Sequence, residues 1–241
     1  MAAERRNNMS YIIHPLILGS ALRPRDPRPG VHPELIEGPV ISYLVIGEGH
    51  HILVDTGGSA PDGVRWMPYF RKPEQDPISQ LSQFGLKPED IDTVILTHLH
   101  WDHAGNNALY TRARFLVQKR EYDEFLSKLE DKRDYDSETA LPTRYEFLDG
   151  DTEIYKGISV LLVPGHSAGF QCVLIETEKK THIILGDTAV RLEHWAEPRL
   201  IQDRGYDTQR LMRAIAKIDA MDLVLLPGHD MDVFHHDTYP V

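Results

Sequence analysis

The hydrophobic positions of this chain fall into short runs separated by polar turns, a pattern typical of strands that alternate with helices. The runs are rich in Val, Ile and Leu and are bounded by Gly, Pro or Asp, as expected for buried strands. They predict strands at residues 39–46, 51–55, 92–97, 114–118, 153–163, 171–177, 181–186 and 223–226. The first two flank a glycine-rich turn at 47–49 and therefore predict a hairpin.

Apolar residues at helical spacing predict three helices between these strands. A short helix is expected at 77–85, where Gly85 ends it, and a second at 119–131. A third begins after Asp207, a good helix N-cap, and carries one apolar stripe. Strand clusters separated by amphipathic helices predict an α/β sandwich in which helices cover the sheets.

The remaining segments lack both patterns. Residues 24–39 are rich in Pro and Gly and predict an ordered loop between two early strands. Residues 57–76 carry aromatic side chains among prolines and are also expected to be a loop. We expect residues 1–241 to form a single domain, with 1–10 as a flexible tail.

Composition narrows the class of protein. Hydrophobic residues make up 41% of the 241 residues, enough for a substantial core. The net charge of −11 disfavours nucleic acid as a partner, because an acidic surface repels phosphates. No apolar run is long enough to span a membrane, and the N-terminus does not resemble a signal peptide, so we expect a cytoplasmic protein with no membrane partner.

The single cysteine, Cys172, lies in an apolar run, which indicates a core residue rather than a nucleophile.

The chemistry is concentrated in one segment, His98-Leu99-His100-Trp101-Asp102-His103, which directly follows an apolar strand. Side chains two residues apart on a strand point to the same side, so we expect the imidazoles of His98 and His100 to lie on the same side of the chain. Asp102 and His103 follow in a turn. Imidazole and carboxylate are the ligands of zinc, iron, manganese or cobalt, and the segment therefore predicts a metal site.

Three further candidate ligands follow the ends of other apolar strands. His166, Asp187 and His229 each come directly after a glycine that closes such a strand. A sheet brings strand ends together, and glycine lets the backbone turn tightly there. One tetrahedral zinc needs only three or four protein ligands, whereas the chain offers five histidines and two aspartates. The count indicates two divalent metal ions, most simply zinc, with one carboxylate between them.

The order of these residues resembles that of the metallo-β-lactamase superfamily. Within it, the chain is most similar to the N-acyl-homoserine lactonases, the quorum-quenching branch, from about residue 39 to the end. The similarity includes Leu53-Val-Asp55-Thr-Gly57, Pro164-Gly-His-Ser-Ala-Gly169 and Gly205-Tyr-Asp207. It implies an αββα sandwich, two mixed sheets packed together with helices on the outer faces. It is also compatible with a homodimer.

The resemblance also implies roles for the candidate ligands. One metal would be held by His98, His100 and His166, the second by Asp102, His103 and His229, and Asp187 would bridge them. Asp55 would lie behind the ligands and fix their orientation. Its other interpretation is an aspartate that caps the turn before Thr56-Gly57.

One departure from the lactonase branch concerns the substrate. That branch has a substrate-contacting tyrosine three residues after the bridging aspartate, and this chain has Val190 there, which cannot donate a hydrogen bond. Nearby Arg191, His194 and Tyr206 are candidates to replace it. The apolar pocket candidates are Trp66, Met67, Tyr69, Phe70, Trp101 and Trp195, although most of these side chains fit ordinary packing equally well.

These observations favour a hydrolase in which a hydroxide attacks a lactone or ester carbonyl. Asp187 and Asp102 are the expected catalytic residues, Asp102 relaying a proton to the leaving oxygen. The expected partner is a small-molecule substrate. Three alternatives stay open. The first is a hydrolase that uses the same site on another ester, thioester, amide or phosphoester. The second is an iron-dependent oxidoreductase of this fold. The third is a non-catalytic binding protein.

Overall fold

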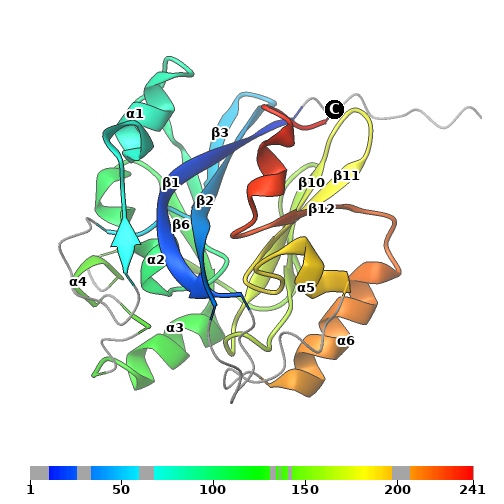
Figure 1. Cartoon of the computed structure of the whole chain (residues 1–241). Coiled ribbons are helices and arrows are strands. Elements are labelled where there is room, and N and C mark those ends of the chain that lie inside the picture. The colour runs from blue at the N-terminus through cyan, green and yellow to red at the C-terminus, as the bar shows by residue number, and fades with distance from the viewer. Residues whose placement is uncertain are drawn as a thin grey trace, which may run out of the picture.

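In the computed structural model of the protein, two mixed sheets form the centre of the molecule (Figure 1). The structure describes residues 11–25, 34–59, 68–130, 134–135, 137–140, 143–196 and 207–240, so the expected tail at 1–10 lies outside them. The first sheet has the strand order β4-β1-β2-β3-β5-β6-β7 and the second the order β12-β11-β10-β9-β8. Their strands are β1 Ile12–Pro24, β2 Leu35–Gly47, β3 His50–Val54, β4 Tyr69–Phe70, β5 Thr93–Ile95, β6 Arg114–Gln118, β7 Tyr145–Leu148, β8 Thr152–Tyr155, β9 Ile158–Leu162, β10 Gln171–Glu176, β11 Thr181–Gly186 and β12 Val224–Pro227.

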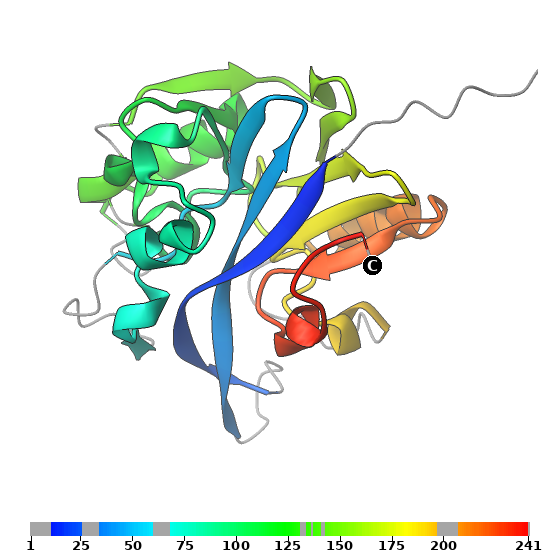
Figure 2. The same cartoon turned by 90° about the horizontal axis from the view of Figure 1, so that it is seen from above.

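Helices cover the outer face of each sheet, as Figure 2 shows from above, with the two sheets between them. The α-helices are α1 Pro77–Ser82, α2 Trp101–Ala104, α3 Lys119–Ser127, α4 Ser137–Ala140, α5 Leu192–Ala196 and α6 Thr208–Asp219. Short 3-10 turns lie at Pro73–Gln75, Pro88–Asp90, Asn107–Leu109 and Met231–His235. The αββα architecture implied by the resemblance is therefore confirmed. Within the described ranges, no helix is long and apolar enough to cross a bilayer.

The alternation of side chains along each strand builds three separate layers of core. In β3, Ile52 and Val54 point into the layer between the sheets, whereas Leu53 points toward α1, α2 and α3. In β10, Val173 enters the same central layer and Cys172 faces the layer beneath α6. Cys172 is fully buried there, which confirms its expected place in the core. Both faces of each sheet are thus covered, and the strand ends are left to carry the chemistry.

Several predicted boundaries were wrong. The predicted strand at 153–163 is two strands, β8 and β9, because Gly157 adopts a left-handed conformation and turns the chain back. The predicted loop at 24–39 ends early, since β2 already begins at Leu35, and the predicted loop at 57–76 contains the edge strand β4. The helix expected at 119–131 stops at Ser127.

Strand β7 was not predicted. It lies at the edge of the first sheet beside β6, and none of its four residues is fully buried. Its sequence therefore lacks the apolar run by which the other strands are recognised.

Candidate metal centre

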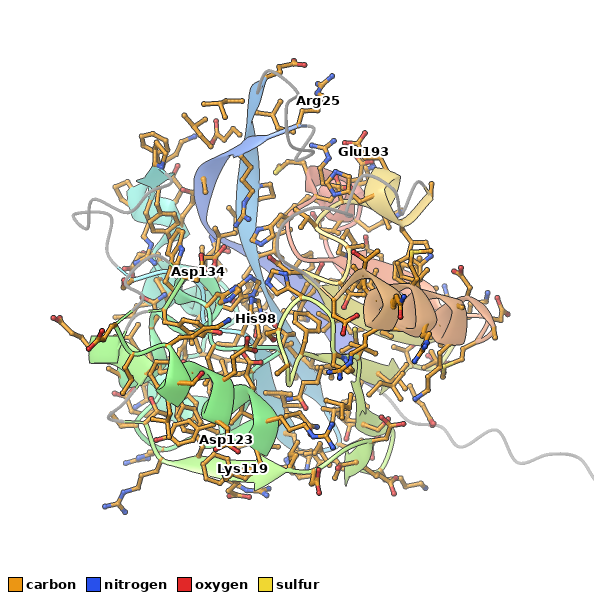
Figure 3. All side chains as sticks on the ribbon, turned by 90° about the horizontal axis from the view of Figure 1, so that it is seen from below. Arg25, His98, Lys119, Asp123, Asp134 and Glu193 are labelled. Atoms are coloured by element: carbon orange, nitrogen blue, oxygen red, sulfur yellow. The ribbon has the colours of Figure 1, made fainter. Side chains whose placement is uncertain are left out.

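The seven candidate ligands meet where strands of both sheets end. His98 follows β5, and His100, Asp102 and His103 lie in the turn that starts α2. His166 follows β9, Asp187 follows β11, and His229 follows β12. Figure 3, which labels His98, shows it near the middle of the molecule. All seven are buried except His100 and His166, which are partly exposed.

Two glycines join the ends of β11 and β12. Gly186 adopts a left-handed conformation at φ +48, which turns Asp187 out of the strand direction. Gly228 has an ordinary conformation but donates a backbone hydrogen bond to the Gly186 carbonyl, and an added Cβ would lie 2.9 Å from that oxygen. Close approach, rather than backbone freedom, therefore explains the glycine before His229. The contact brings Asp187 and His229 to the same point.

Ligand-type atoms form three overlapping groups in the described part of the chain. Each group has its donor atoms within 4.8 Å of one another. The groups are His98, His100 and His166; His98, His103 and Asp187; and Asp102, His103 and His229. The first and last match the two sets that the resemblance implied, and the middle group links them.

Asp187 lies between the two sets and turns one oxygen toward each. Its Oδ2 lies 3.6 Å from Nε2 of His166. Its Oδ1 lies 2.9 Å from Nε2 of His229 and 3.2 Å from Nε2 of His103. A carboxylate in this position can contact two cations at once.

The opposite ring nitrogens are held by the protein. The carbonyl of Pro39 accepts a hydrogen bond from Nδ1–H of His229 at 2.6 Å. Asp55 Oδ2 lies 2.8 Å from Nδ1 of His103 and accepts its proton. These bonds fix the tautomer, so that Nε2 presents its lone pair to the centre.

Asp55 holds a second ligand indirectly. It accepts hydrogen bonds from the backbone N–H of Thr97 at 2.7 Å and from the Thr97 hydroxyl at 2.8 Å. The hydroxyl oxygen in turn lies 3.0 Å from Nδ1 of His98 and accepts its proton. Asp55 is 3% exposed and sits at φ +61, so its left-handed backbone places the carboxylate under both imidazoles.

The surroundings of the site shift the pKa values of two of its histidines in opposite directions. Burial lowers the pKa of His98 well below its ordinary value, and the neighbouring imidazoles lower it further. Burial also acts on His103, but the carboxylates of Asp187, Asp102 and Asp55 outweigh it and raise the pKa of His103 well above 6.5. A proton therefore competes with a cation at His103, and metal binding there would release it.

The donor set fits divalent cations. Nε2 of His98 and Nδ1 of His100 lie 3.2 and 3.1 Å from Nε2 of His166. A tetrahedral zinc with bonds of ~2.0–2.1 Å separates its nitrogens by about 3.3 Å. Nε2 of His103, Nε2 of His229 and Oδ1 of Asp187 are buried and lie 2.9 to 3.2 Å apart, but they make no well-aligned hydrogen bond with one another or with other described residues. Buried polar atoms without partners are costly, and a cation at this point would satisfy them.

Two residues of the site were not predicted from the sequence. Arg23, from β1, donates from Nη2 to Oδ2 of Asp102 and is only 9% exposed. Arg23 is one of three arginines in a proline-rich stretch, and nothing in the sequence distinguishes it from Arg25 and Arg28. Glu121, from α3, is fully buried and accepts hydrogen bonds from the backbone of Leu99 and the hydroxyl of Ser167. Its signal was available, because Glu121 lies four residues before the buried Phe125 and hence on the inner face of the helix.

Two pocket candidates lie together beside the site. Trp101 is 3% exposed and meets Tyr69 edge to face, with ring centroids 5.3 Å apart. Both pack with Ala21 and Val40 in one small cluster. The Tyr69 hydroxyl donates to the carbonyl of Leu18 at 2.6 Å, so it is occupied by the scaffold.

The structure does not gather the other candidates. Phe70 is 53% exposed on the edge strand β4, and Trp195 packs against α6 with its indole N–H donating to Asp219. Arg191 pairs with Glu193, His194 is buried in α5, and the carbonyl of Val190 accepts from the backbone of His229. Trp66, Met67 and Tyr206 lie outside the described residues.

Comparisons with known proteins agree with this geometry. Residues 35–238 match the model of the metallo-β-lactamase superfamily. An N-acyl homoserine lactonase of Bacillus cereus is 31% identical over 218 residues, which cover 82% of this chain and 84% of the relative.

Solved structures share the fold. An N-acyl homoserine lactone hydrolase with N-hexanoyl-L-homoserine at its catalytic metal centre superposes with a TM-score of 0.81, at 26% identity over 95% of this chain and 96% of that one. AidC, a dizinc quorum-quenching lactonase, shares the fold with a TM-score of 0.69 at 16% identity over 93% of this chain and 92% of its own. By its ligand pattern, its fold and these relatives, the chain is a metal-dependent hydrolase that belongs to the metallo-β-lactamase superfamily, in the branch of the N-acyl homoserine lactonases.

Proposed function

We propose that the protein hydrolyses lactones, with N-acyl homoserine lactones as the leading substrates, and that it does so with two divalent metal ions. The observation that carries the proposal is the division of the ligands into two sets on either side of Asp187, whose two oxygens face different sets. Relatives that are N-acyl homoserine lactonases support the choice of bond. Zinc is the simplest occupant because the donors are imidazoles and carboxylates at tetrahedral spacing.

The residues of the chain have distinct parts in this proposal. His98, His100 and His166 would hold one cation, Asp102, His103 and His229 the other, and Asp187 would join them. When bound, two such cations supply Lewis acidity and bring the pKa of water toward neutrality. Asp55 and the Pro39 carbonyl keep the imidazoles oriented, so the ligand geometry need not reorganise during the reaction.

Asp102 is the proposed proton carrier for the leaving alcohol. Burial opposes its ionisation, but the charges of His103 and Arg23 hold the pKa of Asp102 at about 2. A proton that reaches this carboxylate is therefore passed on readily to a more basic alkoxide oxygen. Trp101 and Tyr69 form an apolar wall beside it, which would keep bulk water from the acyl part of a substrate.

Hydrolysis of another ester, thioester, amide or phosphoester is the competing proposal, and Val190 is the observation in its favour. Its apolar side chain offers no hydrogen-bond donor where the lactonase branch has a tyrosine.

A substrate panel separates the two proposals. Protein loaded with zinc is assayed by pH indicator on N-hexanoyl-homoserine lactone, γ-butyrolactone, a linear ester, a thioester and a phosphodiester. We expect kcat/KM to be highest for the acyl lactone. Turnover of the thioester or phosphodiester with no lactone opened would overturn the lactonase proposal. Metal content measured on the same sample should approach two ions per chain.

A further inference from the structure

Arg23 brings a permanent positive charge into contact with one half of the candidate metal centre. It lies on β1, 79 residues before Asp102, and its Nη2 donates to Oδ2 of that carboxylate. Both side chains are about nine-tenths buried, so solvent does little to screen their charges. A guanidinium stays protonated at any pH at which a protein folds.

The oxygen that Arg23 contacts is also the one that faces the other ligands. Oδ2 of Asp102 lies 3.8 Å from Nε2 of His103 and 3.7 Å from Nε2 of His229. Of the three ligand groups, Asp102 belongs only to the one that it forms with these two histidines. The guanidinium therefore adjoins one metal position and not the other.

The contact is built into the strand pair. Gly38 on β2 stands opposite Ala21 on β1, and a Cβ at Gly38 would lie 3.3 Å from Cδ of Arg23. The missing side chain leaves room for the arginine to lie across β2 toward the site. Nε of Arg23 is buried without a hydrogen-bond partner among the described residues, so the ion pair with Asp102 is the polar contact that holds this side chain.

Two effects of Arg23 on a cation oppose each other. The guanidinium repels a second cation and withdraws electron density from the shared oxygen, which weakens binding. It also restrains Asp102, which would strengthen binding. The second effect is the smaller one, because the backbone of Asp102 is already fixed by its place in α2 between the ligands His100 and His103.

We propose that Arg23 makes the two metal positions unequal, so that the position of Asp102, His103 and His229 binds its cation more weakly than that of His98, His100 and His166. This inference rests on the proposed two-metal function. The chain would then fill its positions in order, and the weaker cation would exchange first.

Metal titration tests the proposal without measuring activity. Metal-free protein is titrated with Co²⁺ against a competing chelator, for the wild type, Arg23→Met and Arg23→Lys. Arg25→Met is the matched control, because Arg25 is exposed and pairs with Glu34, and Figure 3 shows it at the tip of the β1–β2 pair, away from His98. His229→Ala assigns the constants, since it should remove the weaker one alone.

We expect two dissociation constants in the wild type that differ by about tenfold or more. Arg23→Met should tighten the weaker constant about tenfold and change the tighter one by less than about twofold. Arg23→Lys keeps the charge and should stay close to the wild type, as should Arg25→Met. If Arg23→Met does not fold, as judged by circular dichroism, Arg23→Gln replaces it.

The proposal is overturned if Arg23→Met weakens the second constant, leaves both constants unchanged, or behaves like Arg25→Met. If the wild type binds only one equivalent of Co²⁺, the stoichiometry refutes the two-metal function itself. That outcome is distinct from the failure of the Arg23 proposal, in which two equivalents still bind.

Discussion

Glu121 provides a quantitative test of how α3 supports the metal centre. Its Oε1 accepts the backbone N–H of Leu99 at 3.0 Å, and its Oε2 accepts the hydroxyl of Ser167 and the backbone N–H of Gly169. The carboxyl group thus ties the His98–His100 turn to the loop that carries His166. Burial raises the pKa of Glu121 to about 7, although the hydrogen bonds from Ser167 and Leu99 lower it.

The raised pKa has a defined effect on stability. Between pH 4.5 and 7 the unfolded chain loses this proton while the folded chain keeps it, so the free energy of unfolding falls as pH rises and the loss is complete above pH 7. The difference between the ordinary 4.5 and about 7 corresponds to roughly 3 kcal/mol, at about 1.4 kcal/mol for each tenfold change in proton affinity. Glu121→Gln removes this titration. Relative to the wild type, the variant should gain about 2 to 3 kcal/mol of stability between pH 5 and pH 8.

Urea unfolding at pH 5, 6, 7 and 8 and constant ionic strength measures this difference. Wild type, Glu121→Gln and the exposed control Glu130→Gln are compared at equal metal content, so that metal-linked protons cancel between variants. The control should follow the wild type at every pH. Equal pH slopes in the wild type and Glu121→Gln would refute the reasoning, because they would mean that Glu121 is ionised in the folded protein across the whole range.

Three further predictions concern the site. Asp187→Ala should lose both turnover and bound metal, measured by elemental analysis, because the carboxylate faces both ligand sets. Wild-type activity in this variant would show that Asp187 is not a metal ligand. Asp55→Asn should lower metal affinity about 10- to 100-fold in a chelator competition, since it weakens the acceptor that orients His103; an unchanged affinity would favour the turn-capping interpretation. Trp195→Phe should lower the free energy of unfolding in urea by about 1 kcal/mol, because it loses the hydrogen bond to Asp219. It should leave kcat/KM within about twofold of the wild type. A large rise in KM for acyl lactones would instead show that Trp195 lines the substrate pocket.

Periodicity located the buried elements of this fold well. Strands β3, β6, β10 and β11 are buried on both faces and were recognisable as apolar runs. Edge strands β4 and β7 carry half-exposed side chains, and sheet pairing rather than composition determines them. The register of β1 with β2 across residues 12–47 depends on contacts that no local pattern encodes.

The site was predictable to the extent that its chemistry is rare. Seven ligand-type residues at strand ends are an unusual pattern, and the structure brings all seven together. Arg23 was not foreseeable, because its contact with Asp102 depends on the pairing of β1 with β2, in which Gly38 leaves room for the arginine side chain. Substrate-pocket residues were the least predictable, since an aromatic side chain such as Trp195 serves helix packing and ligand binding with the same sequence signal.

The hydrogen bond between His229 and the carbonyl of Pro39 has a consequence for biosynthesis. It joins residues 190 positions apart, and the nearby bond from the Tyr43 hydroxyl to the carbonyl of Pro227 spans 184. A ribosome that has translated the whole first sheet, which ends at Leu148, has therefore produced a chain that still lacks His166, Asp187 and His229. Such a nascent chain exposes His98, His100 and His103 without the carboxylate that joins them. The full set of seven ligands is thus complete only after almost all of the chain has emerged, because His229 is the last of them in the sequence.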